Sequence, residues 1–218
     1  MYQVIFYITL FIGIIPSLLL LKENRIYSRH AIIPLVILIA LATLYEFIGT
    51  KIFKINTMYW FQVYPIFEFG TLYYFFSHIL SDYKRLFKAS LFLAIIFYCI
   101  SFFYWSGDNI FISLAINRSF ISFFVLVFSL IWYKNQFDRV RNIDLFETIK
   151  STSLWQNATF YFISGVFIYY CTTFFLFFSS SFIFESKLYF YDFWLVNVLA
   201  TLFYRIILII GVWKMNQD

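Results

Sequence analysis

Residues 192–213 read DFWLVNVLATLFYRIILIIGVW, and only Asp192 and Arg205 among them are charged. A helix needs about 20 mainly apolar residues to cross the roughly 30 Å hydrocarbon core of a bilayer, so this stretch is long enough. Its apolar run is unbroken, whereas a strand of a membrane barrel would have about 10 residues that alternate between apolar and polar. The stretch therefore predicts a helix that spans a membrane.

Six further stretches of this kind occur in the chain of 218 residues, of which 63% are hydrophobic and 12% are charged. Soluble domains carry roughly 25% charged residues, so the composition excludes a soluble globule, and its apolarity excludes a disordered chain. We predict an all-α, polytopic integral membrane protein, a single domain over residues 1–218 with a bundle of about seven transmembrane helices. The helices are expected at about 3–21, 31–50, 58–80, 89–106, 110–133, 154–180 and 192–213.

The lysines and arginines predict which helix ends face the cytoplasm, because cytoplasmic loops carry an excess of them. One face holds eleven, namely Lys22, Arg25, Arg29, Lys84, Arg85, Lys88, Lys134, Arg139, Arg141, Lys150 and Lys214. The opposite face holds three, namely Lys51, Lys54 and Lys187. The N-terminus is therefore expected outside and the C-terminus inside, in the cytoplasmic (inner) membrane. This topology accounts for the net charge of +5, and no basic stripe predicts a nucleic-acid partner.

The longest connection, residues 134–153, has apolar residues at every third position from Phe137 to Ile149. This spacing predicts a short helix over residues 136–150 that lies in the inner membrane interface, with its cations near anionic lipid. Two other interpretations stay open, a solvated connector and a docking segment for a partner protein.

Apart from Asp192 at the first position of the last span, four charged residues lie within the predicted spans, where charge is costly and calls for a partner. They are Glu46, Glu68, Arg118 and Arg205. At about 1.5 Å per residue, Glu68 and Arg118 lie at similar depths and are the best-matched pair. Arg205 is expected to meet Glu68 or to extend to the cytoplasmic headgroups, and Glu46 is shallow enough to be hydrated.

Other polar residues in the same outer half predict an outward-facing polar pocket for a ligand or ion. They are Gln62, Tyr64, Asn117 and Asn197, with Tyr45, Trp60, Tyr73 and Tyr204 as aromatic walls. Pro65 frees the carbonyl of Phe61 and predicts a kink beside Glu68. The competing interpretation is structural, because buried ion pairs also fix how helices pack.

The residue types that common enzymes and metal sites require are absent from the pattern. Neither His30 nor His78 has a histidine four residues away, and Cys99 and Cys171 stand singly, so no metal site or catalytic residue is predicted. The six glycines form no phosphate-binding cluster. We expect no enzymatic activity and no cofactor.

Two stretches resemble small seven-helix integral membrane proteins of the Bacteroidota type. They are the SGxxxYY pattern from Ser164 to Tyr170 and the C-terminal stretch from Trp194 to Trp213. The resemblance covers most of the chain and implies the seven-helix fold, but it implies no catalytic residues and no function.

The favoured hypothesis is a sensor or signalling module that binds a small or lipid ligand in the outer pocket. With no soluble output domain, such a module acts through a cytoplasmic protein partner or a homo-oligomer, besides its contact with membrane lipids. The alternatives are a small transporter or channel, because ionisable residues inside the membrane often mark substrate paths, and a structural subunit of a membrane complex.

Overall fold

The computed structural model describes residues 2–22, 30–54, 58–105, 110–142, 157–178 and 190–215. All regular structure in these ranges is helical, which confirms the all-α class of the prediction. The α-helices are α1 (Tyr2–Lys22), α2 (Ile33–Phe47), α3 (Met58–Ile79), α4 (Lys84–Phe102), α5 (Ile110–Asn142), α6 (Ala158–Phe178) and α8 (Phe190–Met215). A π-helical turn, η2 (Ile48–Ile52), extends α2, and a 3-10 turn, η3 (Ser81–Tyr83), precedes α4.

Five helical segments are long and apolar enough to cross a membrane. They are Val4–Lys22, Ser81–Phe102, Ile112–Asp138, Ala158–Phe178 and Leu195–Met215. The α-helical part of α2 is equally apolar but shorter, at 15 residues. Segments of this length and composition indicate a membrane protein.

Two expected boundaries differ from the structure. Helix α4 begins at Lys84 rather than 89 and ends at Phe102 rather than 106, so Lys84, Arg85 and Lys88 lie in a helix and not in a connector. Helix α5 continues to Asn142, so residues 136–142 of the expected interfacial helix are helical but belong to the same continuous helix as the span before them. No glycine or proline interrupts this part of the chain, and a helix that has begun continues readily through such a sequence. Residues 143–150 of that prediction lie outside the described ranges.

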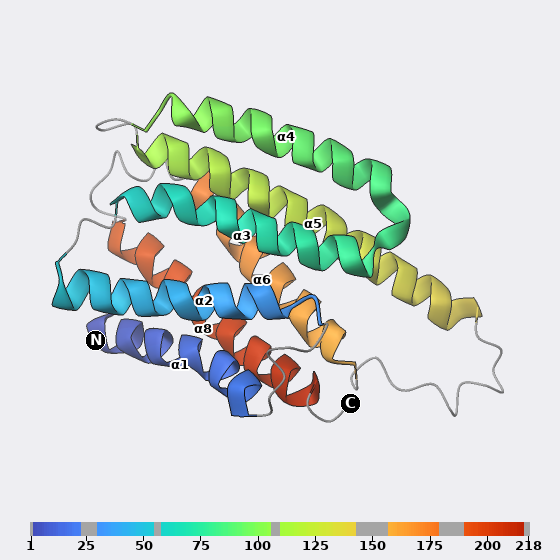
Figure 1. Cartoon of the computed structure of the whole chain (residues 1–218), viewed down its shortest axis with the longest axis horizontal. Helices are drawn as coiled ribbons and strands as arrows, with labels where there is room; N and C mark the ends of the chain where they lie inside the picture. The colour runs from blue at the N-terminus through green and yellow to red at the C-terminus, as the bar shows by residue number, and fades with distance from the viewer. Residues whose placement is uncertain are drawn as a thin grey trace.

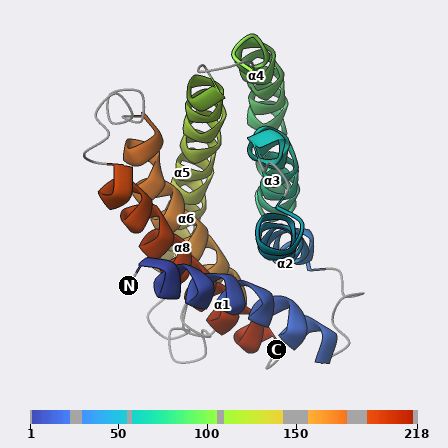
Figure 2. The same cartoon turned by 90° about the vertical axis from the view of Figure 1, so that its left-hand side faces the viewer.

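The helices form a closed ring in which most sequence neighbours are also neighbours in space. Helix α1 packs against α2 and α8, α6 against α5 and α8, and α3 against both α2 and α5. Figure 1 shows the N-terminus and the C-terminus toward opposite ends of the bundle. Figure 2 shows α2, α3 and α4 in one row and α5, α6 and α8 in the other, with α1 joining them at one edge. We call the ends of the bundle the N-terminal end and the C-terminal end.

The core between α3, α4 and α5 is aromatic. Phe124 and Phe128 of α5 lie 4.5 Å apart, and both contact Phe76 of α3 at 6.0 Å between ring centroids. Phe87 of α4 stacks on Phe128 at 4.3 Å. Offset and edge-on ring pairs of this kind add to the packing energy beyond the area they bury. This aromatic core helps to fix the register of α3 against α5. In that register Glu68 of α3 lies opposite Arg118 of α5.

Candidate functional site

A buried ion pair joins α3 to α5 inside the bundle. Arg118 Nη1 donates to Glu68 Oε2, and only 11% and 6% of the two side chains are exposed. The pairing expected from the depths of the two residues is therefore confirmed. Because one charge would be costly without the other in this environment, the pair fixes the relative position of the two helices.

The Arg118 guanidinium also lies against two aromatic rings. Its Cζ is 5.4 Å from the ring centroid of Tyr64 on α3 and 5.7 Å from that of Phe177 on α6. Cation–π contacts of this length are attractive, and more so where water is excluded. Arg118 thus holds α3 and α6 together across α5, and any displacement of its side chain would alter both contacts.

An aromatic series connects the ion pair to α2. Tyr45 of α2 lies 4.5 Å from Trp60 of α3, and Trp60 lies 5.6 Å from Tyr64. Tyr204 of α8, another expected wall residue, stacks on Tyr169 of α6 at 5.1 Å. Tyr73 instead packs among Phe69, Phe87 and Phe124, in the apolar cluster. Tyr73 thus belongs to the aromatic core between α3, α4 and α5, and Tyr204 is buried against α6.

Arg205 forms a second polar network, and its expected partners were wrong. It neither meets Glu68 nor extends to the headgroups: Nη1 donates to the Thr9 carbonyl on α1 and Nη2 donates to Thr43 Oγ1 on α2 at 3.1 Å. Only 8% of Arg205 is exposed. Backbone and hydroxyl oxygens of neighbouring helices satisfy this cation within the bundle, so it has no need to reach the interface.

Gly13 of α1 provides the space for Arg205. A Cβ atom at this position would lie 2.7 Å from Arg205 Cζ and from Thr43 Oγ1, closer than real Cβ contacts allow. The helices α1, α2 and α8 therefore approach one another around the guanidinium only because residue 13 has no side chain. Close approach at a small residue is common where membrane helices pack.

Glu46 lies one residue before the end of α2, next to the π-helical turn η2. Its side chain is half-buried and within electrostatic range of Arg205 and, more weakly, of Arg118. Glu46 thus lies between the two networks. Turns of π-helix are rare and often occur at functional sites.

Several other predicted site residues have buried side-chain polar atoms without a hydrogen-bond partner in the described part of the chain. Gln62 donates through Nε2 to the Trp105 carbonyl at 3.5 Å, while its Oε1 has no partner. Asn117, next to Arg118, lacks a partner on both Nδ2 and Oδ1. Asn197 lacks a partner on Oδ1. Ser113 Oγ, one helical turn before Asn117, is in the same state. Such atoms cost free energy until something bonds to them.

Pro65 is buried within α3, which the structure describes as one helix from Met58 to Ile79. A proline at this position removes the amide donor that the Phe61 carbonyl would otherwise accept. The weakened helical turn therefore runs from Phe61 to Pro65, immediately before Glu68 in α3.

Sequence reasoning missed Thr9, Thr43, Gly13 and the π-helical turn. Threonines in apolar helices usually bond to their own backbone, as Thr9 and Thr43 also do here. Nothing in their local sequence therefore distinguished them as partners of Arg205. Within the described residues, no group of three or more His, Cys, Asp or Glu side chains is placed to hold a metal ion.

No model of a known protein family matches this chain, and neither a curated protein nor a solved structure shows significant similarity to it.

Proposed function

We propose that this protein is a membrane sensor that binds a small ligand with polar groups beside the Glu68–Arg118 ion pair. Binding changes the packing of α3 against α5, and a protein partner detects the change at the C-terminal end of the bundle. The orientation that the basic residues predict would place that end, and the partner, in the cytoplasm. The observation that carries the proposal is a buried ion pair whose neighbours have unsatisfied polar atoms.

The unsatisfied atoms suggest what the ligand offers. Asn117 presents an amide donor and an amide acceptor without partners, and Gln62 presents an acceptor. Each unmade hydrogen bond of a buried group costs about 1–3 kcal/mol, and a ligand that completes these bonds would recover that energy. A neutral molecule with both donors and acceptors fits this set better than an ion, because Glu68 and Arg118 already neutralise each other.

The route from ligand to response follows from the contacts of Arg118. This residue holds Glu68 and Tyr64 of α3 and Phe177 of α6. A ligand that bonds to Asn117 lies next to Arg118 on the same helical turn of α5, and it would change how strongly α5 is held to both neighbours. A ligand shifts a conformational equilibrium only through such differences in contact.

The first experiment measures whether the ion pair controls the far end of the bundle. Spin labels are placed at Asp82 in η3 and Asp138 in α5, both exposed, with Cys99 and Cys171 replaced by alanine. The label-to-label distance distribution is recorded in lipid nanodiscs by pulsed electron resonance. The double variant Glu68→Gln with Arg118→Gln should shift the distribution, because it removes the charge attraction and leaves a neutral polar side chain at each position.

Ser122→Ala is the matched control, since Ser122 is also buried on α5 and its hydroxyl has no partner in the described residues. An unchanged distribution in the double variant, equal to that of the control, would refute the proposed coupling.

The second experiment separates sensing from transport. Proteoliposomes containing a pH-sensitive dye are given a potassium diffusion potential, and proton entry is measured. A sensor should give no entry above protein-free vesicles. Proton entry that disappears in Glu68→Gln would overturn the proposal in favour of transport, for which intramembrane carboxylates are the usual relay.

A further inference from the structure

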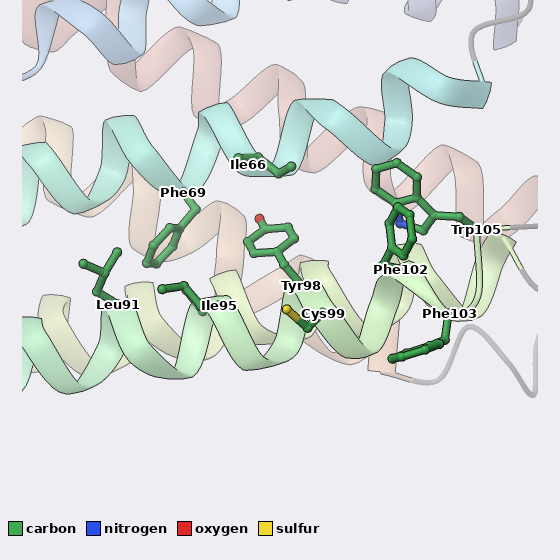
Figure 3. Close-up of a pocket in the computed structure, with 10 residues that line it drawn as sticks. Ile66, Phe69, Leu91, Ile95, Tyr98, Cys99, Phe102, Phe103 and Trp105 are labelled. Atoms are coloured by element: carbon green, nitrogen blue, oxygen red, sulfur yellow. The ribbon is translucent and has the colours of Figure 1, made fainter.

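An apolar groove lies between α3 and the second half of α4. Its volume is about 550 Å³, and Ile66 and Phe69 of α3 face Leu91, Ile95, Tyr98 and Cys99 of α4 across it. Figure 3 shows these side chains between the two ribbons, with Trp105 at one end. The groove adjoins the polar site at Trp105, whose carbonyl accepts the hydrogen bond from Gln62 Nε2.

The groove exists because α4 packs on α5 rather than on α3. Phe87 stacks on Phe128 at 4.3 Å and Phe97 stacks on Phe120 at 5.0 Å, and both pairs join α4 to α5. At the base of the groove lies Ala94, a buried residue too small to reach α3. The walls remain open, because Ile66 and Ile95 are exposed.

The lining is apolar except for two hydrogen-bond donors. The Tyr98 hydroxyl and Trp105 Nε1 line the groove, are shielded, and have no partner in the part of the chain that the structure describes. Figure 3 shows the Tyr98 ring directed across the groove toward α3. Trp105 follows the end of α4 at the N-terminal end, the level at which tryptophans meet lipid headgroups and ester groups.

We propose that this groove binds one acyl chain of a membrane phospholipid, with the ester carbonyl of that chain accepting a hydrogen bond from Trp105. Helix α4 belongs to a segment long and apolar enough to span the membrane, so the groove opens into hydrocarbon. From Trp105 to Leu91 the groove follows α4 for about 21 Å at 1.5 Å per residue. One leaflet of a roughly 30 Å core supplies about 15 Å of hydrocarbon, so a whole chain fits.

The Trp105 donor distinguishes a lipid from a second copy of the protein. A spanning helix of another copy would fill the groove with side chains, but its backbone carbonyls are already bonded within the helix. It would leave Trp105 Nε1 unsatisfied. An ester-linked chain supplies both the hydrocarbon and an acceptor at the correct end. This site does not depend on the proposed sensing function.

The test uses the full-length protein in mild detergent, incubated with palmitoyl-oleoyl phosphatidylglycerol and analysed by native mass spectrometry. The wild type should retain one lipid. Ile95→Trp should lose it, because the larger side chain fills the groove from an exposed position. Leu93→Trp is the matched control, since Leu93 is also exposed on α4 but does not line the groove. Circular dichroism verifies that both variants are folded.

Equal lipid retention by Ile95→Trp and Leu93→Trp would overturn the proposal, and so would a lipid-free dimer that only Ile95→Trp dissociates. The direction of the chain is tested with a photoreactive diazirine on the lipid. Placed at the terminal carbon it should label α4 near Leu91, and placed beside the ester it should label near Trp105. The reverse pattern would refute the role of Trp105, as would a Trp105→Phe variant that holds the lipid as strongly as wild type.

Discussion

Arg118 makes three contacts at once: an ion pair with Glu68, a cation–π contact with Tyr64 and another with Phe177. A buried charge is stable only where neighbouring groups compensate it. When one partner of a buried pair is removed, the remaining charge is left without compensation, and the loss is commonly about 3–5 kcal/mol. When both charges are replaced by apolar groups of similar size, stability often returns. The two charges therefore depend on each other more than the fold depends on either.

The first residue-level prediction follows from this asymmetry. Glu68→Leu alone and Arg118→Met alone should each lower the free energy of unfolding by about 3–5 kcal/mol, because each leaves one uncompensated charge in the bundle. The double variant should recover most of that loss. Reversible unfolding in mixed micelles, followed by circular dichroism, measures the difference. Single variants no less stable than Ser122→Ala would show that the pair is solvated and contradict its burial.

At the scale of single residues, the pairing of Glu68 with Arg118 was predicted correctly from the sequence, whereas the partners of Arg205 were not. Glu68 and Arg118 were matched by depth alone, because residue count along a helix converts directly into depth. The partners of Arg205 depend on which faces of α1 and α2 turn toward α8, and residue count does not contain that information. Gly13, whose missing Cβ admits the guanidinium, is distinguished only once three helices have been brought together.

Among the elements, α6 and α8 make the closest approach, through two glycines. A Cβ at Gly211 of α8 would lie 2.5 Å from Phe162 Cε1, and one at Gly165 of α6 would lie 3.0 Å from Ile207 Cγ2. Lipid is as apolar as the helix surface, so membrane helices associate by fitting closely rather than by escaping water. The SGxxxYY stretch gains a structural explanation here, since Ser164 also bonds to the Tyr133 hydroxyl at 2.8 Å.

The element-level prediction is a pair of glycine substitutions with opposite outcomes. Gly211→Ala should destabilise the protein by about 1–3 kcal/mol, because the buried Phe162 ring has no room to move away. Gly70→Ala is the control: an added Cβ there meets nothing within 4 Å, and alanine favours the helix by about 1 kcal/mol. The same unfolding assay measures both. Equal effects at the two positions would contradict the close contact of α6 with α8.

Helix positions were predictable from the apolar runs, but helix ends were not. The hydrocarbon core sets where an apolar run must stop, whereas the helix itself stops only where the backbone loses its bonds. Helix α4 therefore begins at Lys84, in a basic segment that was read as a connector. Helix α5 likewise continues through polar residues to Asn142.

For the whole molecule, the ring of helices has its termini toward opposite ends (Figure 1). Alternation of basic residues predicts which end faces the cytoplasm. Lys54 at the N-terminal end and Asp82 at the C-terminal end are both exposed. In a background without Cys99 and Cys171, Lys54→Cys should react with an impermeant maleimide in intact cells. Asp82→Cys should react only after the membrane is permeabilised, and the reverse result would invert the predicted orientation.

Membrane character and helical class follow from composition, because the solvent imposes them on any chain this apolar. The order of the helices around the ring is harder to predict from the sequence. Short connections predict that sequence neighbours pack together, and most do. The contact of α3 with α5, which carries the ion pair, and the loose approach of α4 to α3, which leaves the groove, arise from side-chain shape rather than from connection length.

The length of α5 has a mechanical consequence. From Arg118 to Asn142 the helix runs about 36 Å at 1.5 Å per residue, and its distal part extends past the neighbouring helices (Figure 1). Its packing continues well past Arg118, because Phe128 stacks on Phe87 of α4 and Tyr133 bonds to Ser164 of α6. A displacement that begins at the ion pair can therefore reach the C-terminal end of the bundle only if the contacts with α4 and α6 shift as well. These three helices would then move together, and the last turns of α5 would follow them as a rigid extension.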